Sequence, residues 1–211
     1  MSLINFFKEL PARISYKANL MTMLEIVLSL SVPLMVLYAN PLLFTEGASV
    51  ENSQLLILSV ALIIALKAKQ DRKMFIFIAL IIILMLMRET NLGRSYFCAK
   101  YLTPDEMCRW RNMKYGIYVE PLRSLYGVYI VFYFLKNKIY KSIWQYIKNA
   151  PVYLWDIIIL VGSGIIATLA EWPQIDNEIL EESCETLFYL TLVNCIWRYS
   201  RTPVATFFKT E

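Results

Sequence analysis

The sequence contains no histidine, which removes several kinds of functional site at once. Haem sites with a histidine ligand, histidine-based zinc sites and the Ser-His or Cys-His arrangements of hydrolases all need an imidazole. The four cysteines show no Cys-x-x-Cys spacing, so neither a structural zinc site nor a dithiol redox motif is expected. A Walker loop, Rossmann glycines and a Gly-x-Ser-x-Gly elbow are also absent. We therefore predict no cofactor.

Charged residues are scarce, at 18% of the chain, whereas 58% of the residues are hydrophobic. A soluble domain of this length needs a more polar surface than this composition supplies. No repeated half of the kind found in inverted-repeat transporters is visible, and no separate polar domain. The sequence predicts an all-α fold with one integral membrane domain over residues 1–211. Its expected partners are the lipid bilayer and a further protein or a second copy of the chain, but no nucleic acid.

Six apolar segments are long enough to cross a bilayer, which takes about 20 helical residues. The third begins with the 14 apolar residues from Met74 to Met87 and runs directly into Arg88 and Glu89, so we expect this helix to continue toward Gly93. The first is interpreted as a retained span rather than a signal peptide, because its charged lead is long. The predicted spans cover about residues 20–39, 50–66, 74–93, 116–135, 152–170 and 178–197.

Two amphipathic elements are predicted outside the spans. Thr103-Pro104-Asp105-Glu106 has the spacing of a capping box and predicts a short helix in the loop after the third span. Between Lys136 and Lys148, Ile139, Ile143 and Ile147 form an apolar stripe opposite lysines. This pattern is typical of a basic helix that lies on anionic lipid headgroups. Residues 1–19 are either a further interfacial helix or a frayed tail.

The basic residues predict the orientation. With the N-terminus inside, most of the 21 lysines and arginines fall in the four inner segments, and the others lie in or beside one long outer connection, residues 90–115. This distribution satisfies the positive-inside rule with both termini in the cytoplasm. We expect a multi-pass protein of a cell inner membrane.

The predicted topology gives two cysteines a specific role. Cys98 and Cys108 lie in the long outer loop, where a disulfide can form if the compartment is oxidising. Such a bridge closes a short loop and would stabilise it by roughly 2–3 kcal/mol. The alternative is two free thiols. Cys184 and Cys195 belong to the sixth span and are interpreted as small apolar packing residues.

Charged residues gather at the outer ends of several spans. Ionisable groups at this depth are costly and are functional-site candidates by default. Glu120 and Arg123 share one face of the fourth span. Glu178, Glu182 and Glu185 share one face at the start of the sixth span, and Glu171 and Glu181 are nearby. We expect Arg88 or Arg123 to contact Glu182 or Glu185. The candidate site residues are Arg88, Glu89, Glu120, Arg123, Glu178, Glu182 and Glu185.

Two interpretations of this charge cluster stay open. It is either a structural ion-pair network or a polar pocket that binds a charged solute, a cation or a proton. The excess of carboxylates favours a cation or proton, and a metal held without histidine would be a hard ion. Glu25 and Asp156, near the inner ends of their spans, are expected at headgroup level, with polar steps inside the bundle as the alternative.

The leading functional hypothesis is a small inner-membrane protein whose outward-facing Glu/Arg pocket binds or moves a small charged solute, ion or proton. The alternative is a non-catalytic subunit or assembly factor of a membrane complex. A membrane-embedded lipid-modifying enzyme is third, because carboxylates can perform acid–base chemistry but no nucleophile is evident. A cavity lined by Glu120, Arg123, Glu182 and Glu185 would favour the first, and a groove open sideways to lipid the third.

The orientation can be tested with single-cysteine probes and a membrane-impermeant thiol reagent on intact cells. We expect labelling at Ser95→Cys, in the outer loop, and none at Ser142→Cys, in the basic helix. The opposite pattern would contradict the predicted orientation.

Overall fold

The structure is a computed structural model that describes residues 11–44, 49–90, 92, 110, 113 and 116–202. The described part is mostly helical, as the sequence predicts. The Cys98–Cys108 bridge, the short helix after Thr103, the N-terminal interfacial helix and the side chain of Glu120 lie outside the described residues.

The helices follow most of the predicted segments closely. A single helical turn, η1 (Pro41–Leu43), follows the first long helix, and two short strands, β1 (Ile14–Ser15) and β2 (Val152–Tyr153), pair in parallel. The long helices are α2 (Leu20–Tyr38), α3 (Ser49–Lys67), α4 (Arg72–Glu89), α6 (Gly116–Lys136), α7 (Ile139–Asn149), α8 (Leu154–Ala170) and α9 (Glu178–Arg201).

Two helix ends differ from the prediction. The expected continuation of α4 to Gly93 is wrong, because the helix ends at Glu89 and Thr90 is its C-cap. Arg88 and Glu89 therefore lie in the last turn of α4. In contrast, α9 continues to Arg201, about one turn beyond the predicted end at Trp197. Arg198 is thus a helical residue, one turn after Asn194.

Side-chain caps explain where three helices begin. The side chain of Asn19 accepts a hydrogen bond from Thr22 N at 2.6 Å, and that of Asn177 accepts one from Leu180 N at 2.9 Å. At α4, Asp71 accepts from Met74 N at 3.4 Å with its backbone in the left-handed region, φ 35°. Each cap satisfies one of the backbone donors that a helix start leaves without a partner.

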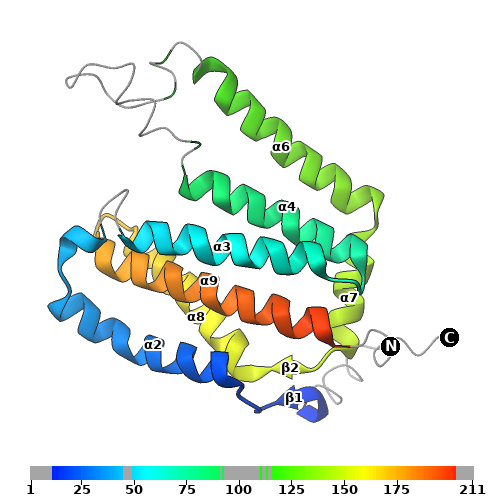
Figure 1. The fold of residues 1–211 in the computed structure, drawn as a ribbon, viewed down its shortest axis with the longest axis horizontal. Coiled ribbons are helices and arrows are strands. Elements are labelled where there is room, and N and C mark those ends of the chain that lie inside the picture. Colours follow the sequence, from blue (N-terminus) through cyan, green and yellow to red (C-terminus); the bar gives the residue numbers. More distant parts are fainter. Residues whose placement is uncertain are drawn as a thin grey trace.

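The helix α9 is the centre of the bundle (Figure 1). It packs against α2, α3 and α8, while α4 lies on the other side of α3. The helix α6 contacts α4 and α7 and diverges from the rest of the bundle. A buried core joins α3, α4 and α9; its members are Leu58, Ala61, Ala65, Ala68, Phe75, Ala79, Ile82, Tyr189, Val193 and Ile196.

The predicted basic helix is present as α7, and its apolar stripe is partly buried against the bundle and partly exposed. Ile139 is fully buried, and Ile143 and Ile147 line a hollow of about 400 Å³ together with residues of α4, α8 and α9. Trp144 remains exposed, with the Lys148 ammonium 5.0 Å from its ring centroid. Part of the apolar side of α7 therefore packs against the bundle.

Two described helices, α2 and α3, are long and apolar enough to cross a bilayer, and α8 is apolar but shorter. Many apolar side chains of α2 are exposed, among them Leu20, Val27, Leu30 and Leu37. The same is true of α6 at Leu122, Leu125 and Val128. Extended apolar surfaces of this kind mark contact with a membrane or another protein. The fold is thus that of a helical protein with membrane-spanning candidates.

The tight α3–α4–α9 core leads to a packing prediction. Ala61 is fully buried in this core, so a larger side chain there must force the helices apart. We expect Ala61→Leu to lower the free energy of unfolding by about 1–3 kcal/mol, measured by denaturant or thermal unfolding in detergent. Val60→Leu enlarges the exposed neighbouring side chain on the same helix and should have little effect. Equal effects of the two variants would contradict the described packing.

Candidate functional site

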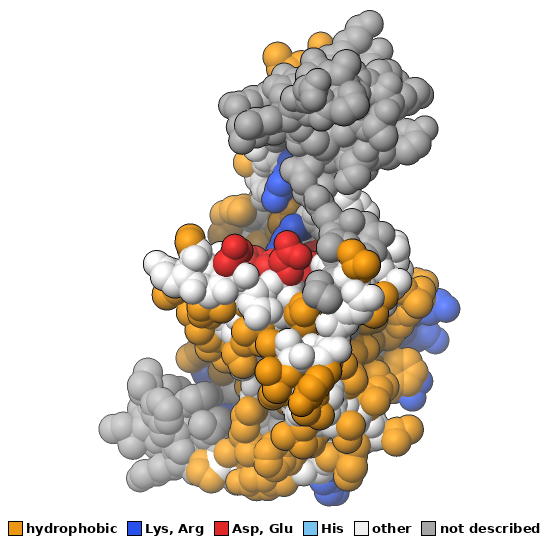
Figure 2. Space-filling model, turned by 90° about the vertical axis from the view of Figure 1, so that its left-hand side faces the viewer, with side chains coloured by type: hydrophobic (Ala, Val, Ile, Leu, Met, Phe, Trp, Pro, Cys, Tyr) orange, Lys and Arg blue, Asp and Glu red, His pale blue; other side chains and the backbone are white. Residues whose placement is uncertain are grey.

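Polar side chains gather in two clusters at opposite ends of α9. We name them by the predicted orientation. The outer cluster comprises Gln54, Arg88, Glu89, Glu171, Glu181, Glu182, Glu185 and Tyr189, and the inner cluster comprises Asn19, Thr22, Glu25, Asp156, Thr191, Asn194 and Arg198. Figure 2 faces the outer end of the bundle, where acidic side chains gather on the surface next to basic ones.

Arg88 is the cation of the outer cluster. Its guanidinium forms a close ion pair with the buried carboxylate of Glu185, and it lies 3.5 Å from Glu171 and 3.8 Å from Glu89. The predicted arginine–carboxylate contact across the bundle is therefore confirmed for Arg88 and Glu185. Because guanidinium and carboxylate groups make strong charge-assisted hydrogen bonds, these contacts tie the ends of α4, α8 and α9 together.

Two polar residues that the sequence analysis missed complete the outer cluster. The Tyr189 hydroxyl donates to Glu89 Oε1 at 2.6 Å, and both residues are buried. On α3, the fully buried Gln54 donates to Glu182 Oε2 at 2.7 Å and to Thr186 Oγ1 at 3.1 Å. No described residue bonds to Gln54 Oε1. Gln54 follows Glu51, Asn52 and Ser53 in the polar first turns of α3, so its residue type alone did not single it out.

Three carboxylates of the outer cluster approach one another closely. One oxygen each from Glu171, Glu181 and Glu185 lies within 4.8 Å of the others. Glu185 is buried, Glu181 is half-buried and Glu171 is exposed. Carboxylate oxygens are the ligands that hard cations prefer. Among the described residues, five carboxylates, those of Glu89, Glu171, Glu181, Glu182 and Glu185, gather around the single guanidinium of Arg88.

The remaining predicted site residues lie apart from this cluster. Glu178 is exposed in the first turn of α9. Arg123 is exposed on α6 and forms no ion pair with any described residue. Together with Arg88, Leu84, Met85 and Ser124 it lines a hollow of about 590 Å³ between α4 and α6. The structure thus does not bring Arg123 to Glu182 or Glu185.

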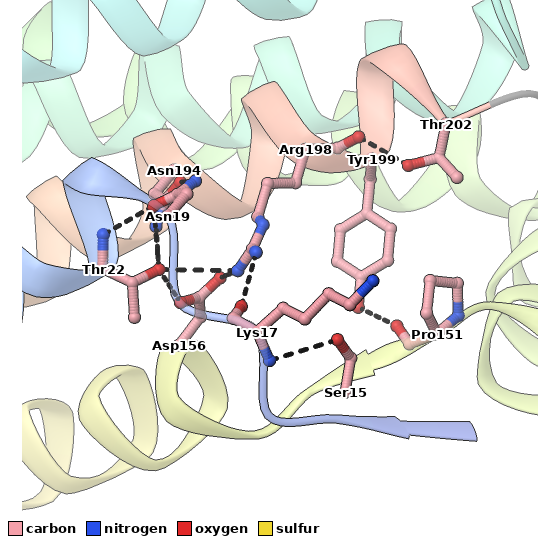
Figure 3. Close-up of polar contacts among 10 residues, drawn as sticks. All are labelled: Ser15, Lys17, Asn19, Thr22, Pro151, Asp156, Asn194, Arg198, Tyr199 and Thr202. Carbon is pink, nitrogen blue, oxygen red and sulfur yellow. Dashed lines mark hydrogen bonds and ion pairs between the residues drawn. The ribbon is translucent and has the colours of Figure 1, made fainter. Parts of the chain in front are cut away.

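The inner cluster is built on a buried ion pair (Figure 3). Arg198 Nη1 lies 2.5 Å from Asp156 Oδ2, and the other oxygen of Asp156 accepts from the Thr22 hydroxyl at 2.6 Å. Arg198 Nη2 donates to the carbonyl of Lys17 at 2.9 Å, and the guanidinium stacks 3.8 Å from the Tyr153 ring centroid. Asp156 is fully buried, so its charge depends on these contacts.

Amides extend this network between α2 and α9. Asn19 Nδ2 donates to Asn194 Oδ1 at 2.9 Å, and Asn194 Nδ2 donates to Thr22 Oγ1 at 3.2 Å. Glu25 and Asp156 are both fully buried, so they face the interior of the bundle, which was the alternative expectation for these residues. The reason is that α9 extends beyond Trp197 and brings Arg198 onto the same helical face as Asn194. Their i, i+4 spacing was the sequence signal.

Among the described residues, the two clusters do not form one continuous polar path. At 3.6 residues per turn, Glu185 and Tyr189 lie on roughly the opposite face of α9 from Asn194 and Arg198. The outer cluster faces α3 and α4, and the inner cluster faces α2 and α8. Between their levels, the α3–α4–α9 core is apolar. The outer cluster is partly open to its surroundings at Arg88, Glu171 and Glu181, whereas Arg198 and Asp156 of the inner cluster are nearly enclosed.

The buried pair of the inner cluster gives a double-mutant prediction. Asp156→Ala leaves the Arg198 guanidinium, only 11% exposed, without its counter-ion. We expect this change and Arg198→Ala each to lower the free energy of unfolding by about 3–5 kcal/mol, and the double change to lose less than the sum. Arg201→Ala, which removes an exposed guanidinium stacked on Trp197, is the control. Additive losses in the double variant would show that the pair is not coupled.

No protein-family model, no curated protein and no solved structure matches the chain. The chemistry of the two clusters is therefore what indicates their role.

Proposed function

We propose that this is a six-span inner-membrane protein whose outer cluster binds a small hard cation. The spans would be α2, α3, α4, α6, α8 and α9, with both termini in the cytoplasm and α7 at the inner surface. The apolar length of α2 and α3 supports this arrangement, as do the exposed apolar flanks of α2 and α6. The distribution of basic residues along the sequence supports the orientation.

The close approach of Glu171, Glu181 and Glu185 is the observation that carries the proposal. Three carboxylate oxygens within 4.8 Å repel one another unless a cation lies among them. Arg88 neutralises part of this charge through Glu171 and Glu185, but it does not reach Glu181 by an ion pair among the described residues. A cation seated beside Glu181 would compensate the remaining charge.

The surroundings of the cluster favour a cation over an anionic solute. In the described part of the chain, carboxylates of the cluster outnumber the guanidinium, and the buried Gln54 contributes a carbonyl oxygen to which no described residue bonds. Oxygen ligands of these kinds suit Ca²⁺ and Mg²⁺. Half of the Arg88 side chain is exposed, so the guanidinium can move aside when a cation enters. The apolar core beneath supports binding at this end rather than passage through the bundle.

A structural brace is the competing function, because Arg88 already links α4, α8 and α9. In this case the protein would be a non-catalytic subunit or assembly factor. The two functions differ in one respect. If the cluster is a brace, a free cation should not restore the stability lost with Arg88. If it is a cation site, removing the Arg88 guanidinium should increase its affinity for a free cation.

Divalent cations should therefore rescue a variant that lacks the guanidinium. In nanodiscs of uncharged lipid, we expect Arg88→Gln to lower the unfolding temperature, because Glu185 loses its counter-ion. CaCl₂ or MgCl₂ should restore it, relative to KCl of equal ionic strength. At 100 times the dissociation constant, the gain in unfolding free energy would be about 2.7 kcal/mol.

Two acidic variants serve as the test and its control. Glu181→Gln removes the carboxylate that forms no ion pair with Arg88, so we expect it to abolish the stabilisation by divalent cations while leaving the Arg88 contacts intact. Glu178→Gln removes an exposed acid from the same helical turn and should retain the stabilisation. If neither the wild type nor Arg88→Gln gains stability from Ca²⁺ or Mg²⁺, the outer cluster is a brace.

A further inference from the structure

Glu25 is a buried carboxyl group that the outer cluster and its proposed function do not involve. It lies on α2 with no exposed surface, and neither of its side-chain oxygens has a hydrogen-bond partner among the described residues. Its polar neighbours are Thr191 and Asn194, and the Asn194 amide uses one of its two N–H groups elsewhere. The Thr191 hydroxyl donates to the carbonyl of Leu187 at 2.8 Å, and the Asn194 amide donates to Thr22.

The inner cluster lacks a counter-ion for this carboxyl group. Among the described residues, the charged or titratable groups that face Glu25 are Asp156 on α8 and Arg198 and Cys195 on α9. Arg198 is the one cation among them, and it is held by Asp156 at 2.5 Å, by the Lys17 carbonyl and by the Tyr153 ring. Two carboxylates therefore lie near one guanidinium, and that guanidinium is paired with Asp156.

A buried carboxylate without a counter-ion or hydrogen bonds is strongly destabilising. A proton neutralises the group without adding volume or requiring new ligands, and burial near another carboxylate favours this neutral form. We propose that Glu25 is a proton-binding site: its carboxyl group holds a proton while Arg198 is paired with Asp156, and releases it when the guanidinium becomes available to Glu25. No other atom is gained or lost in this step.

The geometry also supplies a way for the site to respond to its surroundings. Lys17, whose carbonyl accepts from Arg198, lines an open hollow of about 730 Å³ together with residues 12–16, Asn149 and Pro151. A change in this hollow that moves the Lys17 carbonyl also moves Arg198. The proton on Glu25 is thereby linked to the segment between β1 and α2.

Infrared spectroscopy of the purified protein in nanodiscs tests this proposal, because a protonated carboxyl group absorbs apart from a carboxylate. We expect a protonated-carboxyl band at neutral pH that disappears as the pH is raised. Glu25→Gln should abolish this band, and Glu178→Gln, which removes an exposed acid, should leave it unchanged. A wild-type spectrum without such a band would overturn the proposal, as would a wild-type minus Glu25→Gln difference spectrum without it.

Stability gives a second measurement on the same variants. If the folded protein holds a proton that the unfolded chain does not, its stability is greatest at low pH and falls as the pH rises through the range in which the band disappears. Glu25→Gln copies the neutral carboxyl group in shape, so it should fold, with a weaker pH dependence. A Glu25→Gln variant that fails to fold would contradict the proposal. A band that changes when NaCl replaces choline chloride at constant pH would assign the site to a metal cation instead.

Discussion

The ion pair between Arg198 and Asp156 is the constraint on which the inner end of the bundle depends. It joins α8 to α9 at a point where Asp156 has no contact with the surroundings, and the Thr22 hydroxyl connects α2 to the same carboxylate. A charge at this depth is tolerated only when its partners are fixed. The parallel pairing of β1 with β2 places Tyr153 against the guanidinium, so even the short strands contribute to this arrangement.

The two clusters combine charge in different ways. In the inner cluster the guanidinium is nearly enclosed, and each of its contacts comes from a different element of the fold. In the outer cluster, Arg88 is half exposed and shared among three carboxylates. An enclosed ion pair such as Arg198–Asp156 stabilises one arrangement of the helices. A half-exposed guanidinium among several carboxylates, such as Arg88, can change the carboxylate with which it pairs. This contrast is why we assign cation binding to the outer end and proton binding to Glu25.

The sequence was sufficient to predict the helices and the Arg88–Glu185 contact, because apolar periodicity and helix length place both side chains at one end of the bundle. The sequence was insufficient to predict that the side chains of Glu25 and Asp156 are buried within the bundle. Whether such a group faces lipid headgroups or a neighbour depends on helix rotation, which the apolar pattern of α2 does not determine. It depends also on the continuation of α9 to Arg198, which lies beyond the apolar stretch. Gln54 and Tyr189 were missed for the same reason, because their roles arise from tertiary contacts.

The central position of α9 has a consequence for the order in which the protein can be assembled. A chain is synthesised from its N-terminus, so α2, α3, α4 and α8 are all complete before the helix that joins them exists. Until α9 emerges, Asp156 lacks Arg198, Gln54 lacks Glu182 and Arg88 lacks Glu185. The nascent protein therefore passes through a stage in which these polar groups have no native partner, and its helices can be locked together only after synthesis of the segment from Glu178 to Arg201 is complete.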